Sequence, residues 1–277
     1  MASAPTEFCR HRVGSVRRVT LITSRMPGDW VELEDAVASI LQECGMRVRQ
    51  HERLKLLRGH FDADVVADET VEGISNNIIC ECKFWSTNIP AEKVRSFRVA
   101  VDETGANRGY VISRNGFQSG AVEAARATNV ELVTYERFQE LYFEKWFRTR
   151  IWSVENAIKG FHSYYEPGPF CRPGYAQLES DDERAEYNAA WNQYFFAGAL
   201  LVEFSPYVRM HPGTQAPPPP LPLDVTKIEQ AGFAIPDDIK FETGYREVLA
   251  ALENYAQQAI SDLRTVNPIT RGKPNAD

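Results

Sequence analysis

Two carboxylates and one ammonium group in neighbouring apolar segments are the side chains best suited to chemistry. The run 78–85 (IICECKFW) is apolar apart from Glu81 and Lys83, which are two positions apart. Because strand side chains alternate between faces, these two would share one face, where buried charges must pair or bind an ion. The preceding run 61–67 (FDADVVA) adds Asp64. Adjacent strands holding Asp64 beside Glu81 would provide the oxygen ligands that Mg²⁺ prefers.

Two features beside these acids have more than one interpretation. Asp62 lies on the same predicted strand face as Asp64, so either carboxylate is a candidate ligand. A basic cluster upstream fits a solvent-exposed hairpin as well as a surface that holds phosphates near the metal. Its members are Arg47, Arg49, Arg53, Lys55 and Arg58.

The elements that would position these residues alternate between helix and strand. Residues 30–44 have helical spacing, and Gly45 follows as a residue favoured just after a helix end. The predicted order over 30–135 is helix, three strands, helix, strand, helix, strand, which indicates a mixed sheet packed by helices. The strands are expected at 47–50, 61–67, 77–84, 109–113 and 130–135, with a turn over 69–76 and further helices from 89–90 and over 119–128.

The remaining sequence is predicted to be mostly helical. Helices are expected at 136–159, 181–203 and 247–263, and the tetraproline Pro217–Pro220 indicates a linker or exposed arm. The predicted organisation is an N-terminal extension over 1–29, an α/β domain over 30–138, and a helical C-terminal region over 139–277 with a Pro-rich linker near 216–223.

Composition limits the class of protein. The chain has 277 residues and no apolar run long enough to span a membrane, and its first residues lack the apolar core of a secretory signal. Five cysteines, an odd number, fit reduced thiols in a cytoplasmic protein. The net charge of −7 argues against unspecific nucleic-acid binding.

The ordered set of motifs over 30–138 resembles the catalytic domain of Mrr-type restriction endonucleases, within the PD-(D/E)xK nuclease superfamily. The opening helix has an early glutamate, and a strand with an Asp is followed by a strand with Glu-x-Lys and then by a β-α-β unit. A lone Glu-x-Lys would carry no information. The matching segments are 33–37 (LEDAV), 43–48 (ECGMRV), 58–67 (RGHFDADVVA), 79–83 (ICECK), 109–113 (GYVIS), 116–121 (GFQSGA) and 129–133 (NVELV).

The resemblance implies a restriction-endonuclease-like fold and a role for each site residue. Asp64 and Glu81 would ligate the metal, together with the backbone carbonyl of Cys82. Lys83 would position the attacking water or help to deprotonate it. Glu34 would be an auxiliary ligand or a contact to a water on the metal. Possible DNA contacts are Arg53, Lys55, Arg58 and Gln118.

The resulting hypothesis is a Mg²⁺-dependent DNA endonuclease, with Mn²⁺ able to substitute, acting in bacterial restriction or anti-phage defence. The alternative hypothesis is a non-catalytic assembly or recognition subunit that retains a nuclease-like scaffold. The expected partners are DNA and either a second copy or another protein that binds the C-terminal helical region. No membrane association is expected.

Overall fold

The computed structural model describes residues 21–165, 172–211 and 214–272. Most of the N-terminal extension predicted for 1–29 therefore lies outside the described residues. The described part contains a five-stranded sheet in the order β1-β2-β3-β4-β5. The first three strands are antiparallel, and β3, β4 and β5 are parallel, so the predicted mixed sheet is confirmed. The strands are β1 (Arg47–Lys55), β2 (His60–Val71), β3 (Ile74–Lys83), β4 (Arg108–Ser113) and β5 (Val130–Thr134).

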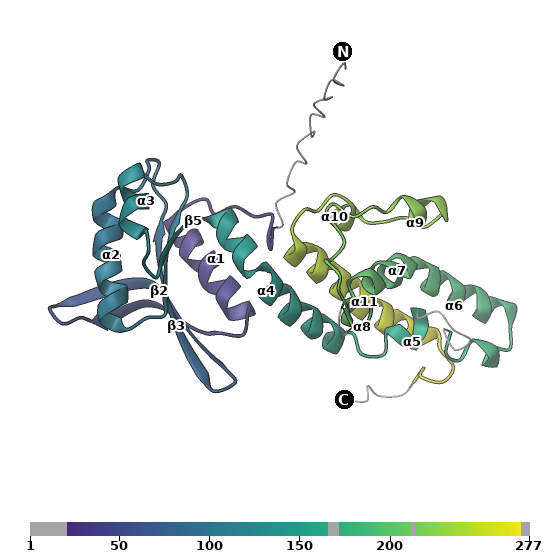
Figure 1. The fold of residues 1–277 in the computed structure, drawn as a ribbon. Helices are drawn as coiled ribbons and strands as arrows, with labels where there is room; N and C mark the ends of the chain where they lie inside the picture. Colours follow the sequence, from purple (N-terminus) through teal and green to yellow (C-terminus); the bar gives the residue numbers. More distant parts are fainter. Residues whose placement is uncertain (1–20, 166–171, 212–213, 273–277) are drawn as a thin grey trace, which may run out of the picture.

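Helices cover both faces of this sheet (Figure 1). On one face, α1 (Trp30–Glu43) and α4 (Tyr135–Ala157) pack over a cluster that includes Val65, Cys80 and Ile112. On the other face, α2 (Ala91–Thr104) and α3 (Ser119–Ala125) lie over the sheet, where Val66 and Ile79 belong to a separate cluster. Neighbouring strand residues thus enter opposite cores, as expected for a sheet buried on both sides.

The predicted turn over 69–76 is wrong. Strands β2 and β3 remain paired as far as Val71 and Ile74, and only Glu72 and Gly73 form the turn. Both turn residues have positive φ, 51° and 83°, which is the geometry of a two-residue hairpin turn. The polar side chains that indicated a long loop lie on a solvent-exposed extension of the hairpin.

The single helix predicted over 181–203 is also wrong. It is divided into α6 (Asp181–Gln193) and α7 (Phe195–Phe204) at Tyr194, whose φ of −113° and ψ of 9° break the helical path. The hydroxyl of Tyr194 donates to Asp262 at 2.5 Å. This bond to a distant helix explains why the local pattern did not reveal the break.

The C-terminal region is mostly helical, as predicted, and shares one hydrophobic cluster with the α1 face of the sheet. A linker or exposed arm was predicted at Pro217–Pro220. Pro217 and Pro220 are exposed, whereas Pro218 and Pro219 are buried and the carbonyl of Pro219 accepts a bond from Tyr245 at 2.9 Å. None of the described helices is long and apolar enough to cross a membrane. The remaining elements are α5 (His162–Tyr165), a 3-10 turn (Tyr175–Gln177), α8 (Pro206–Arg209), β6 (Met210–His211), β7 (Thr214–Gln215), α9 (Thr226–Gln230), α10 (Asp237–Lys240) and α11 (Tyr245–Val266).

Candidate active site

The sheet brings Asp64, Glu81 and Lys83 together. Val65 on β2 pairs with Cys80 on β3, so Asp64 and Glu81 occupy the next step of the antiparallel register. The Lys83 ammonium contacts both carboxylates: its Nζ lies 3.7 Å from Oδ2 of Asp64 and forms an ion pair with Glu81. All three side chains are largely buried, with 19% exposure for Asp64 and 17% for the other two.

Backbone groups of β3 complete this cluster. Oδ2 of Asp64 accepts a hydrogen bond from the amide of Cys82 at 2.7 Å, which fixes the carboxylate against β3. The carbonyl of Cys82 accepts a bond from Lys83 Nζ at 3.3 Å. The carbonyl predicted as a further metal ligand therefore lies beside the same ammonium as the two carboxylates.

Asp62 lies outside this cluster. Its side chain is 58% exposed and accepts a bond from Nε of Arg53 at 2.8 Å. That bond holds the pKa of Asp62 below its usual range. The strand pattern left open whether Asp62 or Asp64 is the candidate metal ligand. Of the two, Asp64 is the one that lies beside Glu81.

Glu34 approaches the cluster from α1. Its side chain is buried, and burial followed by the nearby charge of Asp64 raises its pKa. His51 reaches the same carboxylate, with Nε2 3.7 Å from Oε2 of Glu34. Nothing in the sequence pattern singled out His51, whose backbone adopts a φ of 53° opposite Asp64, in a region that few residues other than glycine occupy.

Two buried carboxylate oxygens indicate that the cluster suits a cation. Oε2 of Glu34 and Oε2 of Glu81 have no hydrogen-bond partner among the described residues. Burying such atoms unpaired is costly, and a hard divalent ion is the ligand that satisfies carboxylate oxygens. In the described part of the chain, however, no three His, Cys, Asp or Glu side chains converge into a ready-made metal cluster. The ammonium of Lys83 is the cation that contacts Asp64 and Glu81.

Burial and charge set the protonation of the pair on β3. Burial raises the pKa of Glu81 despite the opposing effect of Lys83. For Lys83, burial acts to lower the pKa, but Glu81 and Asp64 outweigh it and the pKa is raised. Lys83 is therefore a stable cation at neutral pH.

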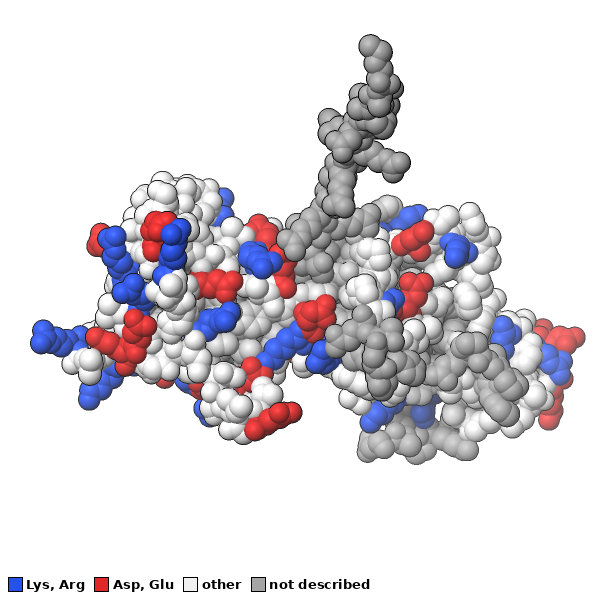
Figure 2. Space-filling model, viewed as in Figure 1, with Lys and Arg blue, Asp and Glu red and all other residues white. Residues whose placement is uncertain are grey.

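The predicted DNA contacts are spread over a wider surface. Arg53 is engaged with Asp62, Lys55 ends β1, and Arg58 is in the turn that precedes β2. Strands β1 and β2 form a hairpin that projects away from the helices in Figure 1, and Figure 2 shows Lys and Arg side chains at its free end. Gln118 immediately precedes α3, and its backbone amide donates to the carbonyl of Ile89 at 3.0 Å.

A family model matches the segment that contains these residues. Residues 26–142 match the family model of the Mrr catalytic domain, described as a restriction endonuclease. This segment is a Mrr-type domain. The resemblance expected from the motifs is thereby confirmed for this part of the chain. No match was found among curated proteins.

Three solved structures show similarity to the chain that contains this Mrr-type domain. A protein of unknown function, AF1548, is 14% identical with a TM-score of 0.34, over 87% of this chain and 97% of its own. The DNA modification-dependent restriction endonuclease AspBHI is 11% identical with a TM-score of 0.28, over 46% and 42%. The MspJI restriction endonuclease, in complex with a 27-mer oligonucleotide, is 17% identical with a TM-score of 0.25, over 43% and 27%. The chain thus spans less than half the length of the two endonucleases.

Proposed function

We propose that this protein is a Mg²⁺-dependent DNA endonuclease that acts in the bacterial cytoplasm in restriction or anti-phage defence. The observation that supports this most is the convergence of Asp64, Glu81 and Lys83 within a Mrr-type domain. The orphan carboxylate oxygens of Glu34 and Glu81 add a reason for a cation at this position.

Each residue of the cluster has a defined part in this proposal. Asp64, Glu81 and the carbonyl of Cys82 would hold the ion, with Glu34 as an auxiliary ligand. Mg²⁺, or Mn²⁺ in its place, would polarise the scissile phosphate and make water a stronger nucleophile. Lys83 would position that water or help to deprotonate it, and its ammonium would stabilise negative charge on the phosphate.

Plasmid cleavage tests the proposal directly. The wild type should cleave in Mg²⁺ and stop in EDTA, and Lys83→Ala should be inactive in Mg²⁺. The chain offers a matched control in its two aspartates: Asp64→Asn should abolish cleavage, whereas Asp62→Asn should retain it, because Asp62 is exposed and paired with Arg53. Cleavage that survives both EDTA and the Lys83 substitution would end the proposal.

The β1–β2 hairpin is the proposed route of DNA to this site. Lys55 and Arg58 are at its end, and neither forms an ion pair within the described residues. Basic side chains free of local partners are suited to phosphate contacts, which position the duplex without reading its sequence. A second copy or a partner protein would bind the C-terminal helical region, and mass measurements with and without DNA would test that part.

A non-catalytic scaffold is the second candidate, and one observation favours it. The Lys83 ammonium already contacts both Asp64 and Glu81, so the chain itself offsets part of their negative charge without a metal ion. Calorimetric titration with Mn²⁺ separates the two candidates. Binding that is lost in Asp64→Asn supports the nuclease, whereas absence of binding in the wild type supports the scaffold.

A further inference from the structure

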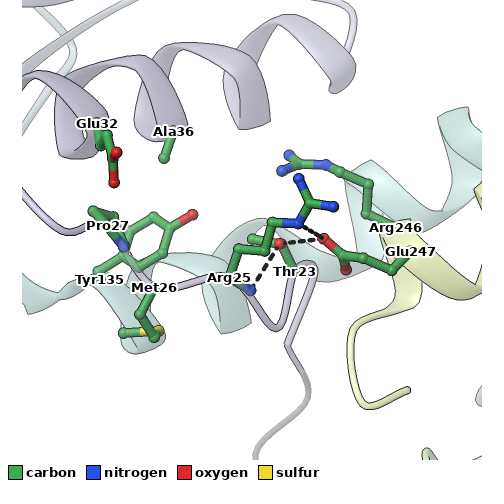
Figure 3. Close-up of a pocket in the computed structure, with 9 residues that line it drawn as sticks. All are labelled: Thr23, Arg25, Met26, Pro27, Glu32, Ala36, Tyr135, Arg246 and Glu247. Atoms are coloured by element: carbon green, nitrogen blue, oxygen red, sulfur yellow. Dashed lines mark hydrogen bonds and ion pairs between the residues drawn. The ribbon is translucent and has the colours of Figure 1, made fainter. Parts of the chain in front are cut away.

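A cavity separate from the catalytic cluster lies where three long helices begin. Its volume is about 220 Å³, and it is lined by the segment 23–27 and by residues of α1, α4 and α11 (Figure 3). Glu32 is in the first turn of α1, Tyr135 is the first residue of α4, and Arg246 is the second of α11. Helix amino ends carry partial positive charge, so their convergence favours a negatively charged ligand.

A buried hydroxyl in this cavity lacks a partner. Tyr135 is 2% exposed, and its hydroxyl makes no hydrogen bond within the described residues. In Figure 3 it points toward the space between Ala36 and the guanidinium groups. Burial raises the pKa of Tyr135 to about 12, although Arg246 opposes this, so the hydroxyl remains a donor at neutral pH.

Two guanidinium groups line the same cavity. Arg246 donates from Nε and Nη2 to Glu43 at 3.1 and 2.8 Å, which leaves Nη1 for a further bond. The side chain of Arg25 is 86% exposed, with Nε 3.9 Å from Glu247, and its terminal nitrogens have no hydrogen bond to a described residue. Guanidinium groups with spare donors are suited to phosphate and carboxylate oxygens.

The acceptors of the cavity, in contrast, already have donors. Glu32 accepts from the amide of Gly28 at 2.7 Å. Glu247 accepts from the Thr23 hydroxyl at 2.6 Å and from the amide of Ser24 at 3.3 Å. The formal charges of these two glutamates and the two arginines cancel. The cavity also holds donors that have no described acceptor: the Tyr135 hydroxyl, the terminal nitrogens of Arg25 and Nη1 of Arg246. These donors are suited to a ligand that carries several hydrogen-bond acceptors.

We infer that this cavity binds a small phosphate-bearing anion of the phosphomonoester class. A phosphate group offers several acceptor oxygens to the hydroxyl of Tyr135, to Arg25 and to Nη1 of Arg246, at the amino ends of three helices. The ligand would join the segment 23–27 to both the Mrr-type domain and α11. This inference goes beyond the proposed nuclease function and does not depend on it.

Calorimetric titration of the full chain with inorganic phosphate and with AMP, in chloride buffers of matched ionic strength, tests the inference. Tyr135→Phe removes only the hydroxyl, and Arg25→Gln removes a largely exposed charge. Each should weaken binding about tenfold, the effect of losing one hydrogen bond to a charged ligand. The matched controls are Tyr207→Phe, at an exposed hydroxyl on α8, and Arg47→Gln, whose side chain is 79% exposed; both should bind as the wild type.

Three results would overturn the inference. The first is no binding of either probe to the wild type. The second is equal affinity in the wild type, Tyr135→Phe and Arg25→Gln, which would place any binding elsewhere. The third is displacement of phosphate by a short DNA duplex with the same dependence on Arg25, which would assign the cavity to the DNA backbone instead of a small ligand.

Discussion

Removing the Lys83 ammonium should destabilise the metal-free protein in a pH-dependent way. The ammonium contacts Glu81 and lies 3.7 Å from Asp64, and all three side chains are largely buried. Two unit charges 4 Å apart interact by about 4 kcal/mol at the effective dielectric constant of partly buried sites. Part of this is offset by the desolvation of the ammonium. We therefore expect Lys83→Met to lose about 3 kcal/mol of unfolding free energy at pH 7, near the lower end for a broken buried pair.

The loss of unfolding free energy in Lys83→Met should become smaller as the pH falls. The direction of this pH dependence follows from the protonation of Glu81. The folded-state pKa of Glu81 is already raised above its ordinary value of 4.5, and without Lys83 it would be raised further. The folded protein then binds the proton more tightly than the unfolded chain does. That contribution to stability is fully present below pH 4.5 and is lost as the pH rises through the raised folded pKa. Lys83→Met should consequently approach the wild type at the acidic end of this range.

Urea unfolding in EDTA at pH 7 and at pH 5 measures this effect. Lys93→Met, an exposed lysine on α2, is the control and should change stability by less than about 0.5 kcal/mol at either pH. Equal stability of Lys83→Met and the wild type at pH 7 would refute the reasoning. So would a loss of the same size at both pH values, because it would indicate lost packing instead of unpaired charge.

Three further predictions concern activity, binding and backbone strain. Asp64→Asn should lower the cleavage rate at least about 100-fold in Mg²⁺ while Asp62→Asn stays near the wild type, and similar losses in both would contradict the assigned ligand. Replacing both Lys55 and Arg58 with alanine should weaken DNA binding for all sequences and reduce the salt slope by about 2 in a titration from low to high salt; an unchanged slope would exclude the hairpin from the interface. His51→Gly should raise the unfolding free energy by about 1 kcal/mol by relieving its positive φ, and a destabilised variant would show that the Glu34 contact outweighs the strain.

Local patterns predicted the sheet well because each strand carries its own signal. The apolar runs 61–67 and 78–85 indicated two strands, and Asp64 and Glu81 lie on the neighbouring strands β2 and β3. Gly45 marked the end of the first helix, and its φ of 84° explains why glycine is favoured there. These features depend on residues close together in the sequence.

Distant contacts account for what the sequence did not reveal. The break at Tyr194 and the burial of Pro219 depend on Asp262 and Tyr245, which lie far along the chain. The cavity at Tyr135 was missed for the same reason, since its lining comes from residues more than 200 positions apart. Tyr135 was predicted as the end of the strand over 130–135, whereas it is the first residue of α4. No pattern of apolar residues shows whether the hydroxyl of a buried tyrosine has a hydrogen-bond partner.

Helix α4 makes the Mrr-type domain and the C-terminal helices one packed unit. The family match ends at residue 142, yet α4 continues to Ala157 without interruption. Just past that boundary, the fully buried Trp146 donates its indole N–H to Glu43 at the end of α1. The same carboxylate accepts from Arg246 of α11 at 2.8 Å. One glutamate of the nuclease-type domain thus binds residues of both α4 and α11, and Arg246 in turn lines the cavity beside Tyr135. Because α4 begins directly after β5, this glutamate connects α11 to the helix that continues from the sheet.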